Sequence, residues 1–239
     1  MIAEYDSSNR GRQLFTGGAL FTAIIVIWPI LMVLSQQEGR MDEQLLALSE
    51  QPGIYMLNFF LASLIAPAIA VILMMLAFRV KTATETPTLN IFGVLFIAPY
   101  VTLASFSYTS QYTVLQSFLR REDFVQAELW YFENFGSVPY FINQLGYVFF
   151  GLSGLFIGFK FLKEQGVPRA VGVLLWISGI LSFIAFGGLA LGSELMNFST
   201  LISGMLTLPI GILVMVWGKG LMRIEGKPLR KRTALNSNS

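Results

Sequence analysis

The chain has 239 residues, of which 54% are hydrophobic and only 13% are charged, and its formal net charge is +2. Soluble domains carry about 25% charged residues, so this composition excludes a soluble globular protein and indicates a membrane protein. The absence of Cys and His excludes disulfides, cysteine nucleophiles and Ser-His-Asp triads, and it argues against zinc and haem sites.

Six apolar segments are each long enough to cross a hydrocarbon core about 30 Å thick, which takes about 20 helical residues. Lipid cannot satisfy backbone polar groups, and the alternating pattern of a membrane barrel is missing from the sequence, so helices are predicted. The predicted spans cover about residues 14–36, 54–78, 88–110, 139–159, 170–192 and 197–218. The predicted fold class is all-α, a polytopic membrane helix bundle with six transmembrane helices that fills residues 1–239 as one domain.

The first span is too long for the apolar core of a removable signal, so we expect it to stay in the membrane.

The positive charges of the chain are concentrated in four segments. Lys and Arg occur in the N-terminal tail, in the second connection (Arg79, Lys81), in the fourth connection and in the C-terminal tail. Only Arg40, Arg120 and Arg121 lie elsewhere. The positive-inside rule therefore predicts that both termini are cytoplasmic.

Neutral polar residues are concentrated in the halves of the spans that this orientation places toward the outside. The third span has Thr102, Ser105 and Thr109 on one helical face. One hypothesis is a cavity open to the outside that binds a small polar or amphipathic ligand. The alternative is hydrogen bonding between helices. The candidate lining residues are Asn58, Thr102, Ser105, Tyr108, Thr109, Asn143, Gln144 and Ser203.

The longest outer connection has apolar residues at helical spacing and a cluster of acids. The spacing predicts an interfacial helix over about residues 113–132. The acids offer carboxylates for general acid–base chemistry, although a solvated acidic loop needs no catalytic explanation. These acids are Glu122, Asp123, Glu128 and Glu133.

The fourth and fifth spans are predicted to form an antiparallel hairpin across a short turn at VPR, residues 167–169. Gly154 and Gly158 form a small-xxx-small pair, which allows close backbone contact. The contact is predicted within the chain, and the alternative is a homo-oligomer or partner interface through the same two glycines.

The same region carries a resemblance. GYVFFGLSGLFIGF and VPRAVGVLLWISGI resemble the helix–VPR–helix region of small uncharacterised bacterial six-span integral membrane proteins. The resemblance covers about residues 140–192. It implies six helices and a bacterial inner membrane, and it implies no activity, cofactor or site residue.

The basic tail that follows the sixth span indicates contact with anionic lipid headgroups rather than nucleic acid. No charged residue lies inside a predicted span, so an ion-coupled pump is not expected. The predicted function is a non-enzymatic interaction or accessory protein that binds a lipid-like ligand and needs no cofactor or metal. A passive permease or channel subunit is the first alternative, and a membrane enzyme using outer-loop carboxylates is the second.

Overall fold

The computed structural model describes residues 2–78 and 87–225, which are helical apart from short turns. Six helical stretches in these ranges are long and apolar enough to cross a membrane, which confirms the predicted fold class. They are Asn9–Ser35, Gly53–Phe78, Pro87–Leu119, Val138–Phe159, Val167–Leu191 and Ser199–Arg223. The predicted connection with Arg79 and Lys81 and the predicted tail after Glu225 lie outside the described residues.

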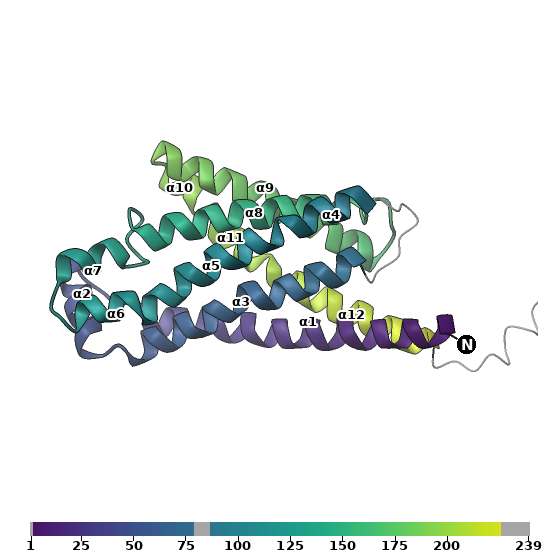
Figure 1. Cartoon of the computed structure of the whole chain (residues 1–239), viewed down its shortest axis with the longest axis horizontal. Coiled ribbons are helices and arrows are strands. Elements are labelled where there is room, and N and C mark those ends of the chain that lie inside the picture. Colours follow the sequence, from purple (N-terminus) through teal and green to yellow (C-terminus); the bar gives the residue numbers. More distant parts are fainter. Residues whose placement is uncertain (1, 79–86, 226–239) are drawn as a thin grey trace, which may run out of the picture.

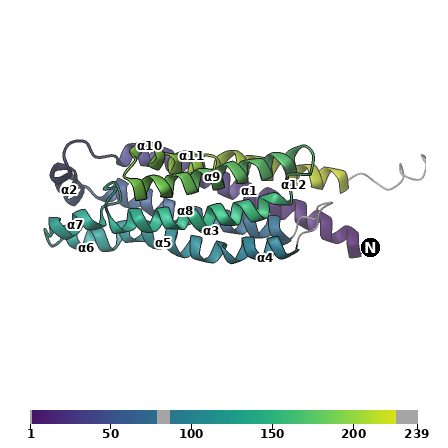
Figure 2. The same cartoon turned by 90° about the horizontal axis from the view of Figure 1, so that it is seen from above.

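The crossings run side by side along the long axis of the molecule (Figures 1 and 2). The start of α1 and the end of α12 lie at the same end of the bundle (Figure 1). The helices that form the crossings are α1 (Ile2–Ser35), α3 (Gly53–Phe78), α4 (Pro87–Leu95), α5 (Ile97–Tyr112), α8 (Val138–Phe159), α9 (Val167–Leu191), α11 (Ser199–Met205) and α12 (Thr207–Glu225). A short helix, α10 (Glu194–Asn197), joins α9 to α11.

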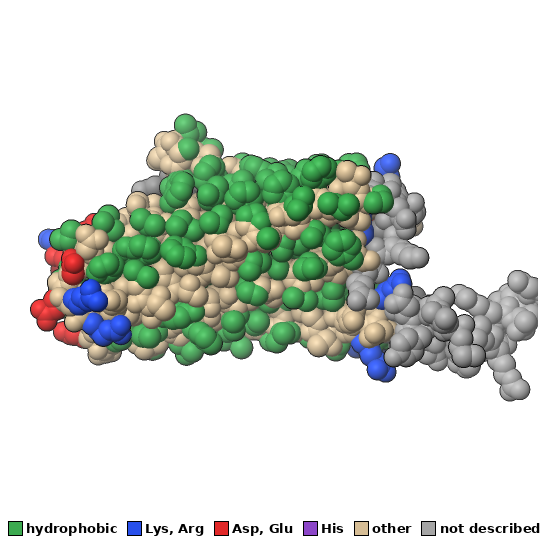
Figure 3. Space-filling model, viewed as in Figure 1, with side chains coloured by type: hydrophobic (Ala, Val, Ile, Leu, Met, Phe, Trp, Pro, Cys, Tyr) green, Lys and Arg blue, Asp and Glu red, His purple; other side chains and the backbone are tan. Residues whose placement is uncertain are grey.

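The surface of the bundle is apolar along the spans and charged at the ends (Figure 3). Large apolar side chains are widely exposed on it: the exposed fraction is 62% for Leu20, 57% for Ile30 and 50% for Phe60. Apolar side chains of this size on the outside of a long helix are expected where lipid replaces water as the solvent. The surface therefore supports a membrane-embedded bundle.

The end of the bundle opposite the termini is covered by a structure that we call the end cap: α2 (Met41–Glu50), α6 (Val114–Leu119), α7 (Phe124–Trp130) and residues 131–137. The segment expected as one interfacial helix over 113–132 is thus two short helices. The chain turns between them, where Glu122 has a φ of 57° and the Asp123 carboxylate accepts a hydrogen bond from Gln126 N at 3.2 Å. Leu115 and Ala127 are fully buried, whereas Val125 is 75% exposed.

Glycines hold α8 close to α9. A Cβ on Gly151 would lie 3.0 Å from the carbonyl oxygen of Gly179, and a Cβ on Gly158 would lie 3.0 Å from that of Gly172. Gly154 similarly faces the carbonyl of Leu175 at 3.1 Å. The predicted close contact within the hairpin is confirmed, and within one chain α9 covers the glycine pair considered for an oligomer interface.

A second glycine contact, between α1 and α12, did not follow from the sequence. A Cβ on Gly218 would lie 2.5 Å from Phe15 N and 2.6 Å from the carbonyl oxygen of Gly11. A Cβ on Gly18 would lie 2.7 Å from Met215 N. The first and last crossings therefore touch backbone to backbone at two levels.

Lys160, at the end of α8, is only 3% exposed. Its Nζ donates a hydrogen bond to the carbonyl oxygen of Ala77 at 3.0 Å and lies 5.1 Å from the centre of the Phe161 ring. Ala77 is in the last turn of α3, where carbonyl groups lack helical partners and attract positive charge. The side chain thus ties the end of α8 to the end of α3.

Replacing Lys160 with Met should lower the free energy of unfolding by about 1.5 kcal/mol, because the apolar side chain cannot donate to Ala77 and a charge-assisted bond is lost. Lys163→Met is the matched control, since Lys163 is exposed. Titration with SDS in mixed micelles would measure the free energy of unfolding of both variants. Equal effects of the two substitutions would contradict the tie.

Candidate functional site

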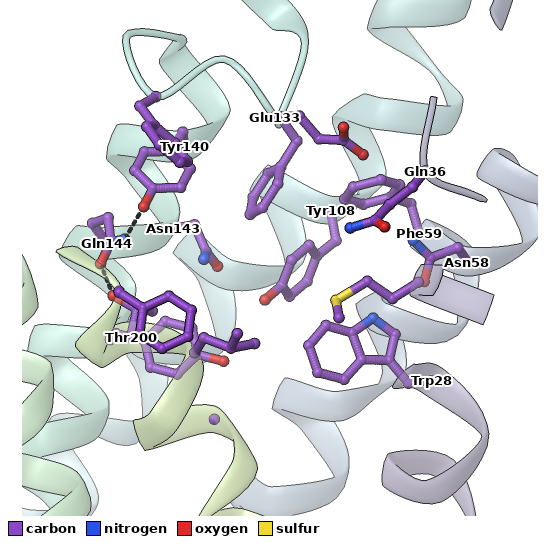
Figure 4. Close-up of a pocket in the computed structure, with 17 residues that line it drawn as sticks. Trp28, Gln36, Asn58, Phe59, Tyr108, Glu133, Tyr140, Asn143, Gln144 and Thr200 are labelled. Carbon is purple, nitrogen blue, oxygen red and sulfur yellow. Dashed lines mark hydrogen bonds between the residues drawn. The ribbon is translucent and has the colours of Figure 1, made fainter. Parts of the chain in front are cut away.

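A cavity of about 580 Å³ lies between the spans, beside the end cap. Aromatic rings from several helices form most of its wall, and a few amide, hydroxyl and carboxyl groups interrupt them (Figure 4). The aromatic residues are Trp28, Phe59, Tyr108, Phe132, Phe135, Tyr140, Tyr147 and Phe198. The remaining lining residues are Met32, Gln36, Asn58, Glu133, Asn143, Gln144, Thr200, Leu201 and Gly204.

Four of the eight candidate residues from the sequence lie in this wall: Asn58, Tyr108, Asn143 and Gln144. They come from α3, α5 and α8; residues 79–96 separate α3 from α5 in the chain, and residues 113–137 separate α5 from α8. The structure therefore brings together half of the predicted set.

The other four candidates lie elsewhere. Thr102 is exposed, and the Thr109 hydroxyl donates to the carbonyl oxygen of Ser105 at 2.6 Å along its own helix. Ser203 is fully buried and exchanges hydrogen bonds with Ser178, at 2.9 Å between the hydroxyl oxygens. These hydroxyls fit the alternative interpretation, in which they bond within or between helices.

The face of α5 that turns inward differs from the face chosen from polarity. Its buried positions include Ala104, Ser107, Tyr108 and Gln111, at the spacing of one helical stripe. The stripe of Thr102, Ser105 and Thr109 is displaced around the helix from it. A row of small hydroxyl residues on one face of α5 therefore did not predict which face lines the cavity, because each hydroxyl can form a hydrogen bond with the backbone of its own helix.

Asn58 presents an acceptor without a partner. Its Nδ2 donates to the Ser35 hydroxyl oxygen at 2.9 Å, and that hydroxyl donates to Met32 O at 3.0 Å. Since the hydroxyl proton is already used, Ser35 must accept from the amide NH₂, which fixes the orientation of the amide. Asn58 Oδ1 has no hydrogen-bond partner within residues 2–78 and 87–225, although Asn58 is only 3% exposed.

Asn143 presents a second such acceptor. It is 3% exposed, and its Oδ1 also lacks a hydrogen-bond partner in the described part of the chain. Figure 4 shows its amide directed into the space between Tyr108 and Gln144. Buried carbonyl oxygens are normally paired, by protein, water or ligand. Two unpaired ones in a single cavity indicate a place for hydrogen-bond donors that are not part of this chain.

Gln144, by contrast, is held on both sides. Its Nε2 donates to the Tyr140 hydroxyl at 2.8 Å, and its Oε1 accepts from the Thr200 hydroxyl at 2.6 Å. Both bonds are visible in Figure 4. The bond to Tyr140 lies within α8 and the bond to Thr200 connects α8 to α11, and together they fix one side of the cavity wall.

Glu133 is the one acidic residue among the described residues that line the cavity. The Tyr131 hydroxyl donates to its Oε2 at 3.0 Å, which favours the charged form, but burial raises the pKa of Glu133 above its usual value. No Lys or Arg stands among the described lining residues. The other three acids of the outer connection, Glu122, Asp123 and Glu128, are exposed.

Gln111 positions the segment that carries Phe132 and Glu133. It is fully buried in α5. Its Oε1 accepts from the Tyr55 hydroxyl at 2.8 Å and from Phe132 N at 3.0 Å, and its Nε2 donates to the carbonyl oxygen of Trp130 at 3.0 Å. One side chain thus joins α3, α5 and the end cap at the edge of the cavity.

Several aromatic residues of the lining are not among the candidates predicted from the sequence, because aromatic side chains are common throughout membrane spans. One signal was present for α8: Tyr140, Asn143, Gln144 and Tyr147 have the i, i+3, i+4, i+7 spacing of a single helical face. Trp28 and Phe198 carried no comparable signal, because only the folded bundle brings α1 and the residue before α11 to this place. Among the described residues, no three His, Cys, Asp or Glu side chains lie close enough to hold a metal ion.

Six apolar crossings and an interior cavity beside one end define an α-helical, multi-pass integral membrane protein. Residues 16–219 match the family described as DUF4386, a domain of unknown function, and the chain belongs to this family. The family agrees with the resemblance of the hairpin to uncharacterised six-span membrane proteins. Comparisons with curated proteins and with solved structures return no match.

Proposed function

We propose that this protein is a non-enzymatic binding protein of the membrane, whose cavity holds one small amphipathic molecule. The observation that carries the proposal is the pair of buried amide oxygens, on Asn58 and Asn143, that lack partners in the described chain and lie in one aromatic cavity. A volume of about 580 Å³ is within the range of small-molecule sites, which are typically apolar with a few fixed polar groups.

The position of the cavity supports binding rather than passage. Its lining comes from the parts of the helices nearest the end cap, and the mouth is marked by exposed Gln36, Phe135 and Phe198. In the other half of the bundle, Leu73 of α3, Ile157 of α8 and Val214 of α12 are fully buried. A second hollow there, between α1 and α3, shares no lining residue with the cavity. A cavity whose lining lies in one half of the bundle favours a binding protein over the permease or channel alternative.

The direction of access follows from the charge pattern. With both termini cytoplasmic, as the positive-inside rule predicts, the end cap faces the outside and the ligand enters from there. The proposed location is a bacterial inner membrane, on the resemblance of the hairpin region. A role as an accessory subunit would then consist of presenting the bound molecule to a partner at the outer surface.

A cysteine pair tests the cavity, because the natural chain has no Cys. Leu201→Cys places a thiol on the wall, whereas Ser203→Cys, two residues later, places one in a fully buried position outside it. In sealed proteoliposomes, a membrane-impermeant methanethiosulfonate should modify the first more than about tenfold faster, since the second reacts only after local opening.

2-Phenylethanol, a small neutral amphipathic probe, should slow the modification of the Leu201→Cys variant and leave the slow modification of Ser203→Cys unchanged. Equal rates for the two thiols would overturn the open cavity. Rapid modification at Leu201→Cys that no small amphipathic molecule of this size slows, whether neutral or charged, would overturn ligand binding.

A further inference from the structure

The groups that face the cavity specify the charge of its ligand, and this inference rests on the binding function proposed above. Among the buried side-chain nitrogen and oxygen atoms of the lining residues, two have no hydrogen-bond partner in the described part of the chain, and both are carbonyl oxygens: Asn58 Oδ1 and Asn143 Oδ1. A carbonyl oxygen accepts hydrogen bonds and cannot donate them. A molecule that satisfies both must therefore carry N–H or O–H donors.

The charged group of the wall has the same preference. Glu133 contributes a carboxylate, and the described lining offers no Lys or Arg that would attract an anion. A bound anion would thus meet a like charge in a partly desolvated place, where repulsion is weakly screened. A bound cation would be attracted to the same carboxylate.

The aromatic wall also suits a cation. The Phe132 ring lies at the centre of a cluster, with its centroid 5.3 Å from that of Phe59, 5.6 Å from that of Tyr108 and 5.6 Å from that of Tyr140. Trp28 lies beside Tyr108 and across the cavity from Gln144 and Thr200 (Figure 4). Aromatic faces attract organic cations, and the attraction is strongest where water is excluded.

We propose that the cavity binds an organic ammonium ion, a primary or secondary amine in its charged form that is carried on a small apolar group. An N–H group of the ammonium ion donates to one of the two amide oxygens, Asn58 Oδ1 or Asn143 Oδ1, the charge is balanced by Glu133, and the apolar group lies against the rings. The volume of about 580 Å³ suits a compact amine rather than a two-chain phospholipid.

The proposal has a pH dependence with a definite sign. Burial raises the pKa of Glu133, and the ionisable groups that act with it are the hydroxyls of Tyr131 and Tyr55, which remain neutral near pH 7. A protonated Glu133 offers no charge to the ligand. Affinity for an ammonium ion is therefore low below the pKa of Glu133, rises as pH increases through it and is constant above it until the amine itself loses its proton at about pH 10.

Three probes of nearly equal shape separate charge from size: 2-phenylethylammonium, 2-phenylethanol and phenylacetate. Isothermal titration calorimetry on the protein in lipid nanodiscs, with empty nanodiscs as the blank for partitioning, measures all three. We expect the ammonium ion to bind about tenfold more tightly than the alcohol, and the anion to bind most weakly.

Four variants assign the effect to residues. Asn143→Leu and Asn58→Leu are made separately, and the one that removes the acceptor of the ammonium group should weaken binding of the ammonium ion about tenfold, because one hydrogen bond is worth about that factor. If neither substitution weakens binding, the amide oxygens do not hold the ligand. Asn90→Leu is the matched control, since Asn90 Oδ1 also lacks a partner but lies in α4, outside the cavity. Glu133→Gln should weaken the ammonium ion, leave the alcohol unchanged and abolish the pH dependence.

The outcomes separate this inference from the function on which it depends. Equal binding of alcohol and ammonium ion, or tighter binding of phenylacetate, would overturn the ammonium proposal and leave the binding function standing. Binding of none of the three to the wild-type protein would overturn both. A Glu133→Gln variant that keeps full affinity for the ammonium ion and the original pH profile would remove the carboxylate from the proposal and contradict it.

Discussion

The Gln111→Leu variant is expected to lose about 4 kcal/mol of unfolding free energy, the largest single effect in the chain. The substitution keeps the approximate volume but leaves three groups without their partner: the Tyr55 hydroxyl, the backbone N–H of Phe132 and the carbonyl oxygen of Trp130. Each buried polar group left unsatisfied costs about 1–3 kcal/mol. SDS titration in mixed micelles gives the free energy directly.

Gln116→Leu is the control for this prediction. Gln116, in α6, is 3% exposed, but its Nε2 makes only a long hydrogen bond, 3.5 Å, to the carbonyl oxygen of Gln111. We expect a loss of about 1 kcal/mol there. If the two variants were equally stable, the hydrogen bonds of Gln111 would not be what holds the end cap.

The Gly218→Ala variant carries the second largest expected effect, a loss of about 3 kcal/mol. The added methyl group would lie 2.5 Å from Phe15 N and 2.6 Å from the carbonyl oxygen of Gly11. Backbone atoms cannot move aside as the end of a side chain can, so α12 must separate from α1 along the contact. Thermal unfolding followed by size-exclusion chromatography in detergent would show the loss as a lower midpoint.

Gly220→Ala provides the comparison on the same helix, because a Cβ there meets nothing within 4 Å. In a helix interior this change should be neutral or stabilising by a few tenths of a kcal/mol, since alanine is the better helix former. A similar loss in both variants would show that helix propensity, and not contact with α1, controls stability at this end.

The parts of the fold that follow from hydrophobicity were predictable. Membrane crossings require long apolar helices, so the six spans and the fold class could be derived from residue type alone. The hairpin contact through Gly151 and Gly158 was also accessible, because small residues at helical spacing mark close packing in membranes. The contact of Gly218 with α1 could not be predicted, because its partner lies about 200 residues earlier in the chain. No feature of either helix in the sequence identifies the other as its neighbour.

The cavity was half predictable for a related reason. Asn58, Asn143 and Gln144 were found because amides are costly in a bilayer and need a purpose there. Ser203 was included for its polarity, but its hydroxyl is satisfied by Ser178 in the next helix. Phe59 and Trp28 were left out because a ring that faces lipid and a ring that faces a cavity look the same in a sequence.

The last crossing is made of two helices that meet at Leu206 and have different neighbours. The first, α11, packs on α9 and supplies Thr200, Leu201 and Gly204 to the cavity wall, whereas α12 packs on α1 and α9 through the rest of its length. The wall of the cavity and the contact between the first and last crossings therefore depend on separate stretches of one span. Substitutions in a turn or two of α11 would alter the cavity wall without disturbing the contact that keeps the first and last crossings together.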